Sequence, residues 1–439
     1  MQEFFNLAII LLWPLICCLV YTRVNSITAA FISIVGGFLL LPVNVSIDLP
    51  IVPDIDKNFS SFIGVVLGVT IVKRQYFSWF GNDKSIKNLL ILIFILTFIN
   101  FIFNQDPIFN GEFWVQGLTL HEAISASMRN YLAIFPLIIG LNVVKSEDDI
   151  IKLHKILVIA LLLYLPLVAV ELLMSPQLHR LLYGFHPHSF AQQIRGDGYR
   201  AMVFTGHGLV TANVYLGGFI ALLILFKLKK YLISKYVNLF LLFTFFVSLI
   251  LLKSLTALIL AVASIFILYF FGHGIRNIVV KSILLISIAY PIVITLNLLS
   301  LDYLYDLLQE VVPTERLQSL FFRLRNENAF IDYLGNNFFI GYGGLGRGFL
   351  SGGIVDGRWL VSIMHYGLFF WIVNVFIYSI YLFRVEVKSE KVILIFSVLP
   401  MVMLLDQLPN SSWNNPWAWL YAGAVISLLN IYKKHHFSK

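Results

Sequence analysis

Long apolar segments recur along most of the chain, and they limit its fold more than any other feature of the sequence. A helix needs roughly 20 mostly apolar residues to cross about 30 Å of hydrocarbon, where every backbone amide has to be paired within the segment. Hydrophobic residues make up 59% of the 439 residues and charged residues only 12%, with a mean hydropathy of +0.86. A water-soluble globule of this size could not solvate that composition. The sequence therefore predicts an all-α, polytopic transmembrane bundle.

We expect about 12 or 13 membrane spans, because two candidate segments, 60–72 and 131–144, are too short to cross a bilayer without flanking residues. The whole chain, residues 1–439, is expected to form one integral membrane domain. Its first apolar segment has no basic n-region and no clear cleavage site, so it is expected to be a retained helix. The remaining candidate spans are 4–21, 27–43, 89–103, 156–174, 204–226, 237–252, 255–271, 283–299, 360–382, 392–408 and 417–431.

Lysine and arginine fall in alternate connectors between these spans, which predicts the orientation of the chain. Short cytoplasmic loops of membrane proteins are enriched in these residues. The basic connectors would therefore face the cytoplasm and the others would face outward, including the two longest loops, 175–203 and 300–359. The basic connector residues are Lys73, Arg74, Lys84, Lys87, Lys145, Lys152, Lys155, Lys227, Lys229, Lys230, Lys235, Arg276, Lys281, Arg384, Lys388 and Lys391, followed by Lys433 and Lys434 in the tail.

Arginine, rather than lysine, is the main cation of the two long outward loops, against the usual charge bias across a membrane. A guanidinium group can donate two parallel hydrogen bonds to one phosphate or carboxylate, whereas an ammonium is a point charge. These loops therefore favour an anionic ligand, with salt bridging to acids of the second loop as the alternative. The arginines are Arg180, Arg195, Arg200, Arg316, Arg323, Arg325, Arg347 and Arg358, and the acids are Asp302, Asp306, Glu310, Glu315, Glu327 and Asp332.

The first cluster, IRGDGYRAMVFTGHG at residues 194–208, combines a fixed cation with a titratable imidazole. Arg200 and His207 at the outer mouth of a span suit an anionic lipid headgroup and a proton acceptor. The alternative for His207 is a hydrogen-bonded interfacial histidine. The same loop holds His186 and His188, but no third zinc ligand is settled, so no metal is expected.

The second cluster, residues 315–358, contains the glycine-rich string GYGGLGRGF. Gly341, Gly343 and Gly346 match the spacing G-x-G-x-x-G, but a dinucleotide site also needs a βαβ unit, which an outward loop of a helical bundle does not offer. Glycine would still let backbone N–H groups close on an anion, with Arg347 adding charge. A tight turn over the membrane surface is the alternative.

Asp356 and Lys253 are two further candidates. Asp356 opens an apolar segment, where it would cap the helix or serve, between arginines, as a general base. Lys253 stands in the string KSLT between two apolar segments, so it either reaches the outer surface beneath the two long loops or ends a helix.

The strings LPVNVSIDLPIVPDIDK, GYRAMVFTGHGL, LLKSLTAL, ERLQSLFFRLRNENAF, IGYGGLGR and DGRWLVSIMHYG occur in this order along the chain. Together they resemble the O-antigen ligase and polymerase superfamily of bacterial membrane glycosyltransferases, and more narrowly its exopolysaccharide-type branch. The resemblance covers most of the chain in topology and is sharpest over residues 178–367. It implies a C-type glycosyltransferase-like scaffold in a bacterial inner (plasma) membrane, with the active site on the periplasmic, extracytoplasmic side.

The chemistry that the resemblance implies is a glycan transfer without metal or cofactor. A hydroxyl of a glycan or lipid acceptor would attack the anomeric carbon of an undecaprenyl-diphosphate-linked glycan, and undecaprenyl diphosphate would leave. Both a ligase and a polymerase fit this description. Membrane lipids are the other expected partners, and nucleic acid is not expected.

The resemblance also gives roles to residues. Ligases of this superfamily carry a His-Asn pair where this chain has Asp356-Gly357. Either Asp356 or His207 is therefore expected to be the base, with Arg200 beside it. The diphosphate would contact Arg200, Arg316, Arg323, Arg347 and Lys253, and the supporting residues would be Glu327, Gly343, Gly344 and Arg358.

A transporter or flippase for polysaccharide or lipid-linked glycan is the competing function, since it would also have many helices and arginines that attract anions. Few ionisable residues lie near the middle of the predicted spans. Transport pathways usually need some there, which favours the enzyme.

Overall fold

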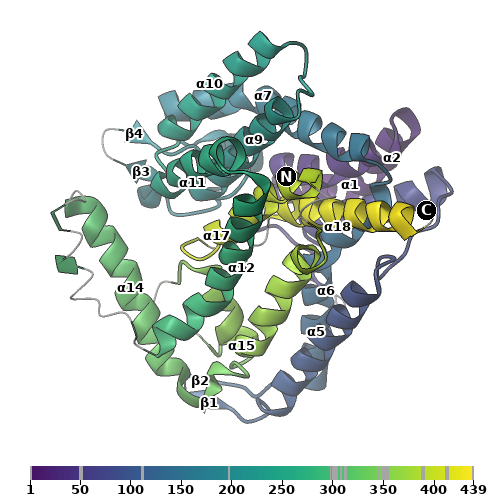
Figure 1. Ribbon diagram of the computed structural model, residues 1–439. Helices are drawn as coiled ribbons and strands as arrows, with labels where there is room; N and C mark the ends of the chain where they lie inside the picture. Colours follow the sequence, from purple (N-terminus) through teal and green to yellow (C-terminus); the bar gives the residue numbers. More distant parts are fainter. Residues whose placement is uncertain are drawn as a thin grey trace.

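Helices make up almost all of the regular structure (Figure 1). The computed structural model describes residues 2–48, 53–109, 113–195, 198–296, 298, 305–306, 309–310, 314–344, 346–348, 355–386, 391–410 and 415–437. The strands in this described part form two short antiparallel hairpins, β1 (Ile108–Phe109) with β2 (Trp114–Val115) and β3 (Ile194–Arg195) with β4 (Gly198–Tyr199).

The helices follow one another in a simple order. They are α1 (Gln2–Arg23), α2 (Ser26–Phe31), η1 (Ile32–Gly36), α3 (Gly37–Leu40), α4 (Lys57–Leu67), η2 (Gly68–Val72), α5 (Lys84–Ile102), α6 (Leu120–Val143), α7 (Glu147–Met174), α8 (Leu178–Tyr183), η3 (Phe190–Gln193), α9 (Gly208–Lys227), α10 (Lys235–Leu251), α11 (Leu255–Ile265), η4 (Phe266–Phe270), α12 (His273–Thr295), α14 (Thr314–Leu334), η5 (Gly335–Phe338), α15 (Arg358–Ser379), η6 (Ile380–Phe383), α16 (Lys391–Phe396), α17 (Val398–Asp406) and α18 (Pro416–Phe437).

Seven of the described helices are long and apolar enough to cross a membrane, judged by length and composition. They are α1, α5, α6, α7, α9, α12 and α15 continued by η6. Shorter apolar helices accompany them, namely Ser26–Leu40, Lys57–Val72, Lys235–Leu251 and Leu255–Phe270. This architecture agrees with the predicted all-α bundle, and each predicted span falls wholly or partly on a helical stretch.

The two short predicted spans do extend into flanking residues. The segment 131–144 forms the second half of α6, which begins at Leu120 with a capping box. The segment 60–72 runs from α4 into η2, and α4 starts where the Asp56 side chain accepts two backbone N–H groups. Other boundaries differ too, since α12 begins and ends earlier than the predicted 283–299 and α7 begins earlier than the predicted 156.

α9 lies in the interior of the bundle, where α7, α10, α11 and α17 pack against it. Every residue from Thr211 to Leu225 is buried. Elsewhere α6 and α18 meet backbone to backbone, since a Cβ at Gly140 would lie 2.5 Å from the carbonyl oxygen of Leu420 and one at Gly423 would overlap that of Leu137. Small residues allow membrane helices to approach this closely. The chain segment before α9 thus leads into a fully packed interior helix.

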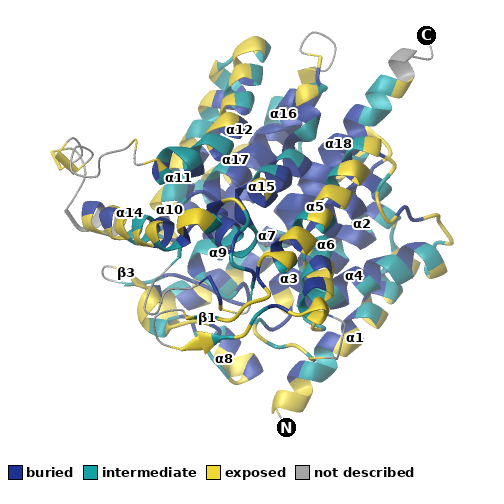
Figure 2. Cartoon of the chain, turned by 90° about the horizontal axis from the view of Figure 1, so that it is seen from below, coloured by how far each residue is buried: buried dark blue, intermediate teal, exposed yellow. Residues whose placement is uncertain are grey.

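Connectors far apart in the sequence meet at one end of the bundle, which we name the loop end (Figure 2). Asn44 Nδ2 donates to the carbonyl oxygen of Pro187 at 2.8 Å, and Lys253 Nζ donates to that of Arg195 at 2.7 Å. These bonds bring together the segments that the sequence predicts to share one side of the membrane. The described residues of the loop end are 41–48, 53–56, 103–109, 113–119, 175–195, 198–207, 252–254, 296, 298, 305–306, 309–310, 314–344, 346–348, 355–357, 407–410 and 415.

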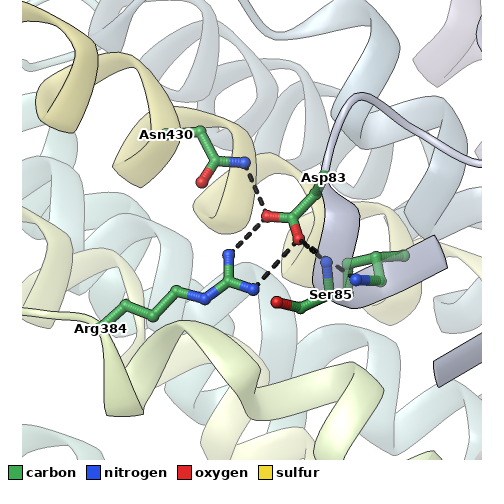
Figure 3. Close-up of polar contacts among 5 residues, drawn as sticks. Asp83, Ser85, Arg384 and Asn430 are labelled. Atoms are coloured by element: carbon green, nitrogen blue, oxygen red, sulfur yellow. Dashed lines mark hydrogen bonds and ion pairs between the residues drawn. The ribbon is translucent and has the colours of Figure 1, made fainter. Parts of the chain in front are cut away.

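The opposite end, which we name the basic end, is held together by the carboxylate of Asp83 (Figure 3). Arg384 donates to it through Nη1 at 2.5 Å and Nη2 at 3.1 Å, and Asn430 Nδ2 donates at 2.9 Å. Asp83 also caps α5 by accepting the backbone N–H groups of Ser85 and Ile86. Burial would raise the pKa of Asp83, but these hydrogen bonds outweigh it and hold the pKa below its ordinary value. Lys84, Lys145, Lys433 and Lys434 surround the adjoining pocket.

Part of the predicted loop 300–359 forms a helix. α14 runs crosswise to the long helices of the bundle (Figure 2). Its buried apolar residues are Leu317, Phe321, Phe330, Ile331 and Leu334. It places Arg323 and Glu327 one helical turn apart, so that both lie on the same face.

The Asp83 anchor gives the first prediction. Replacing Arg384 with Ala leaves a buried carboxylate without its cation, a change that costs roughly 3–5 kcal/mol for fully buried pairs. The Arg384 side chain is 22% exposed, so we expect a loss near or below the lower limit. Asp83→Asn keeps an acceptor for the cap and should cost less. Thermal unfolding of the purified protein in detergent should rank Arg384→Ala as least stable, then Asp83→Asn, then the exposed control Lys230→Ala. Equal unfolding temperatures for Arg384→Ala and Lys230→Ala would contradict the anchor.

Candidate functional site

His207 sits at the N-terminus of α9, where its side chain caps the helix. Nδ1 accepts the backbone N–H of Leu209 at 3.1 Å, so the neutral imidazole carries its proton on Nε2. The ring of His188 meets it edge to face, with 4.7 Å between ring centroids. Burial lowers the pKa of His207 to about 4, and the charges of His188, Arg200, Arg195 and Arg323 lower it further. At neutral pH His207 is therefore an uncharged hydrogen-bond donor surrounded by cations.

Arg200 lies across the first turn of α9, beside His207. A Cβ at Gly208 would overlap the Arg200 side chain, so only glycine leaves room for it there. Arg200 is 4% exposed, and its Nη2 donates to the carbonyl oxygen of Lys253 at 3.1 Å. Lys253 in turn holds the β3–β4 hairpin through the carbonyl oxygen of Arg195. Both predicted diphosphate ligands of this region, Arg200 and Lys253, thus lie together.

A buried carboxylate in α7 fixes the backbone that carries these groups. Glu171 Oε2 accepts the N–H groups of Met202 at 2.8 Å and Val203 at 2.7 Å, and Oε1 accepts that of Leu178 at 3.0 Å. Val203 has a φ of 49°, a left-handed conformation that β-branched residues rarely adopt. The hydrogen bonds to Glu171 hold this strained turn, which directs Arg200 and His207 to the same place.

The second long loop reaches the same site through α14. Arg323 Nε forms an ion pair with Asp356 Oδ2 at 3.0 Å, and the two side chains are 24% and 35% exposed. Its Nη1 lies 3.5 Å from the carbonyl oxygen of Pro409. Because the charge of Arg323 also lowers the pKa of His207, residues of both long loops act on one imidazole. The two long loops are therefore related electrostatically through the effect of Arg323 on His207.

Asp356 does not cap α15, contrary to one of the two expectations for it. Gly357 occupies the N-cap position, and no side chain bonds there. The Asp356 carboxylate instead pairs with Arg323 and remains one-third exposed, so a substrate hydroxyl can reach it. Of the two candidate bases, Asp356 has free acceptor oxygen lone pairs, while the Nδ1 of His207 is taken by the helix. This arrangement favours Asp356 as the base.

Glu327 is buried one turn beyond Arg323 and accepts a hydrogen bond from the Tyr290 hydroxyl at 2.9 Å. Burial raises the pKa of Glu327 to about 7. The hydrogen bond from Tyr290 and the charge of Arg323 oppose this effect, while the charge of Asp356 adds to it. Glu327 therefore changes its protonation near neutral pH, next to the predicted base.

Arg347 and the glycine-rich segment have a structural role that differs from the predicted one. The Arg347 guanidinium donates to the backbone carbonyl oxygens of Tyr342 at 2.9 Å, Gln116 at 2.5 Å and Asp106 at 3.0 Å. Its donors join two connectors of the loop end, which favours a structural function over the predicted diphosphate binding. The side chain of Arg316, another predicted ligand, lies outside the described residues.

The backbone N–H of Gly343 bonds to an interrupted helix, α15, and not to an anion as predicted. α15 is interrupted at Gly367, which has φ 83° and ψ 171°. The N–H groups of Tyr342 and Gly343 donate at 2.8 Å to the carbonyl oxygens of Met364 and His365 that the break sets free. A Cβ at Gly367 would overlap the Phe339 backbone. The neighbouring Gly344 lies in a turn, and its carbonyl oxygen is 3.4 Å from the backbone nitrogen of Arg347.

The histidines of the first long loop are the side chains that a zinc site would use there. Within the described ranges, no group of three or more His, Cys, Asp or Glu side chains is placed to hold a metal ion. His179 is buried, and its Nδ1 bonds to the Phe185 carbonyl oxygen at 2.9 Å. His188 faces His207.

Three residues of the site were missed as functional candidates. A carboxylate such as Glu171 within an apolar run is itself a signal of a polar function. Nothing in the sequence indicated that Tyr290 of α12 would meet Glu327 or that His188 would meet His207.

Glu327 gives a prediction about pH. A carboxyl whose pKa is raised in the folded state contributes stability that is fully present below its ordinary pKa of 4.5 and is lost as the pH rises through about 7. Glu327→Gln removes that loss, because an amide does not ionise. The unfolding temperature of Glu327→Gln minus that of the unaltered chain should therefore be more positive at pH 8 than at pH 5. A difference that stays constant over this range would show that Glu327 does not titrate as described.

Comparison of the chain with protein-family models, with curated proteins and with solved structures gives no match. The resemblance to the O-antigen ligase and polymerase superfamily therefore stays a prediction, and the function has to be inferred from the geometry around His207.

Proposed function

We propose that this chain is a membrane glycosyltransferase of the polysaccharide ligase or polymerase type. It would transfer a glycan from undecaprenyl diphosphate to an acceptor hydroxyl at the loop end. The observation that carries the proposal is that arginines from two separate loops act electrostatically on one uncharged histidine, and that one of them pairs with a carboxylate that is one-third exposed. Cations that repel one another at one place are stabilised when an anion binds between them.

The diphosphate of the donor fits between the two arginine-bearing segments. Its oxygens would accept hydrogen bonds from Arg200 and Arg323, and the Nε2–H of His207 would donate a further one. The lipid chain would lie along the apolar helices below. Arg195 and Lys253 adjoin the same place and add positive charge.

The reaction needs one proton acceptor and a stabilised leaving group. Asp356 would take the proton of the acceptor hydroxyl while the hydroxyl oxygen forms a bond to the anomeric carbon. The bond from that carbon to the diphosphate oxygen breaks, and the electron pair leaves with undecaprenyl diphosphate. The arginines stabilise the negative charge that develops on the leaving group, an effect for which single donors contribute about 10²–10³ in kcat in other enzymes.

The orientation in the membrane follows from the distribution of charge between the two ends. Lysines gather at the basic end around the Asp83 anchor, which would face the cytoplasm of a bacterial cell. The loop end, with its arginines and acids, would face the periplasm or cell exterior. In this arrangement the described helical stretches cross the inner membrane about 12 or 13 times, counting paired short helices as one span.

The site gives a prediction for the cell. Arg200→Ala and Arg323→Ala should each lower the yield of long-chain glycan by about 100-fold or more, since each removes a donor to the leaving group. The matched control is Arg325→Ala, which changes an exposed arginine of the same helix α14. The measurement is glycan profiling of a deletion strain that carries each variant at equal membrane abundance. Normal polymer from Arg200→Ala and Arg323→Ala would overturn the site.

The same profiling separates the two reaction types. Loss of chain length in the deletion strain would identify a polymerase. Chains of normal length that stay on their lipid carrier would identify a ligase.

A further inference from the structure

A second cavity lies on the other side of the segment that carries Asp356. Its volume is about 570 Å³, within the range of about 300–1,000 Å³ that is typical of small-molecule sites. Among the described residues, its lining includes Asn44, Val45, Ser46, Pro53, Asp54, Asp56, Asn58 and Phe59, the α6 residues Arg129, Asn130, Leu132 and Ala133, and the α15 residues Arg358, His365 and Tyr366. Asp356 does not line the cavity, but only Gly357 separates it in sequence from Arg358, which does.

Two arginines face this cavity without a carboxylate partner. Within the described part of the chain, neither Arg129 nor Arg358 forms an ion pair or a side-chain hydrogen bond. The Nε atom of Arg358 is fully buried and has no hydrogen-bond partner. An unsatisfied donor of a buried cation is costly, and a bound anion would remove that cost.

The acids of the cavity do not neutralise these arginines. The Asp56 carboxylate accepts the backbone N–H groups of Asn58 and Phe59 at the start of α4. Asp54 Oδ2 lies 3.4 Å from the hydroxyl of Ser46. Both carboxylates therefore serve their own connector, yet each keeps lone pairs that can accept hydrogen bonds from a ligand.

The interruption of α15 shapes the same cavity. His365 and Tyr366 directly precede the break at Gly367 and lie on the cavity wall. Non-helical backbone at membrane depth is tolerated where it is buried in protein or lines a cavity. The docked glycine segment satisfies the freed carbonyl oxygens of Met364 and His365, so the break is built into the fold.

The lining combines two kinds of recognition. The two guanidinium groups can bind an oxyanion, and the carboxylates and amides of the lining suit hydroxyl groups. An anion flanked by several hydroxyls is the pattern of an acidic sugar.

We infer that this cavity binds a sugar that carries a carboxylate or a phosphate, as the accepting residue of the proposed transfer. The inference rests on the proposed function for its role as acceptor site. Arg129 and Arg358 hold the oxyanion of the sugar, and a hydroxyl of the same sugar is directed toward Asp356 across Gly357. The protein thereby selects acidic glycans over neutral ones.

Binding can be tested without any lipid-linked donor. The full chain, purified in detergent, is titrated with methyl α-glucuronide, methyl α-glucoside 6-phosphate and neutral methyl α-glucoside, and binding is followed by saturation-transfer NMR. One or both acidic sugars should bind at least about tenfold more tightly than the neutral glucoside. The acidic sugar that binds more tightly identifies the anion as carboxylate or phosphate. Equal binding of all three, or no binding, overturns the inference.

Variants locate the site. Arg129→Gln and Arg358→Gln should each weaken binding of the acidic sugar by about tenfold, leaving the neutral glucoside unchanged. Arg129 is exposed on α6, so Arg129→Gln should fold. The test therefore stays valid if Arg358→Gln fails to fold. Unchanged affinity for the acidic sugar in Arg129→Gln overturns the inference.

Arg200→Gln is the control that separates the two proposals. It should bind the acidic sugar as the unaltered chain does, because Arg200 belongs to the diphosphate site. Failure of the proposed function would appear as normal polymer from Arg200→Ala, whatever the sugar affinities are.

Discussion

A bundle of apolar helices can hold charge only where its helices end or where a cavity admits polar groups, because an ion in hydrocarbon loses its hydration. The structure follows this constraint closely. At the basic end the Asp83 carboxylate binds Arg384 and Asn430. The polar residues of the candidate site lie at the loop end. Within α7 the buried carboxylate of Glu171 is engaged by three backbone N–H groups. The polar groups of the candidate site therefore lie in one layer above the apolar core.

That layer is organised by a strained turn and an ion pair. Glu171 holds Val203 in a left-handed conformation and so brings Arg200 onto Gly208, next to His207. Arg323 then connects α14 to Asp356. The result is an imidazole kept neutral by burial and by the cations around it. An oxyanion between these cations would relieve their repulsion, which favours the proposed diphosphate donor.

Apolar runs predicted the helices and their approximate ends, since helix length in a bilayer is set by a single physical thickness. The family resemblance implied that Arg200, Arg323 and Asp356 would belong to one site, and the structure pairs Arg323 with Asp356. Other features depend on tertiary contacts that no local pattern encodes. Arg347 was expected to bind phosphate, but it spans three backbone carbonyl oxygens of segments far apart in the sequence. The break at Gly367 and the cavity beside it depend on the docking of residues 340–343, which composition does not reveal.

The central claim is that two arginine-bearing loops hold a lipid diphosphate while its glycan is transferred. The most direct measurement uses the purified chain in lipid vesicles that contain a labelled undecaprenyl-diphosphate-linked glycan. We expect free undecaprenyl diphosphate to be released in step with glycan transfer. Unchanged donor that has moved between the two leaflets would contradict this account and identify a flippase.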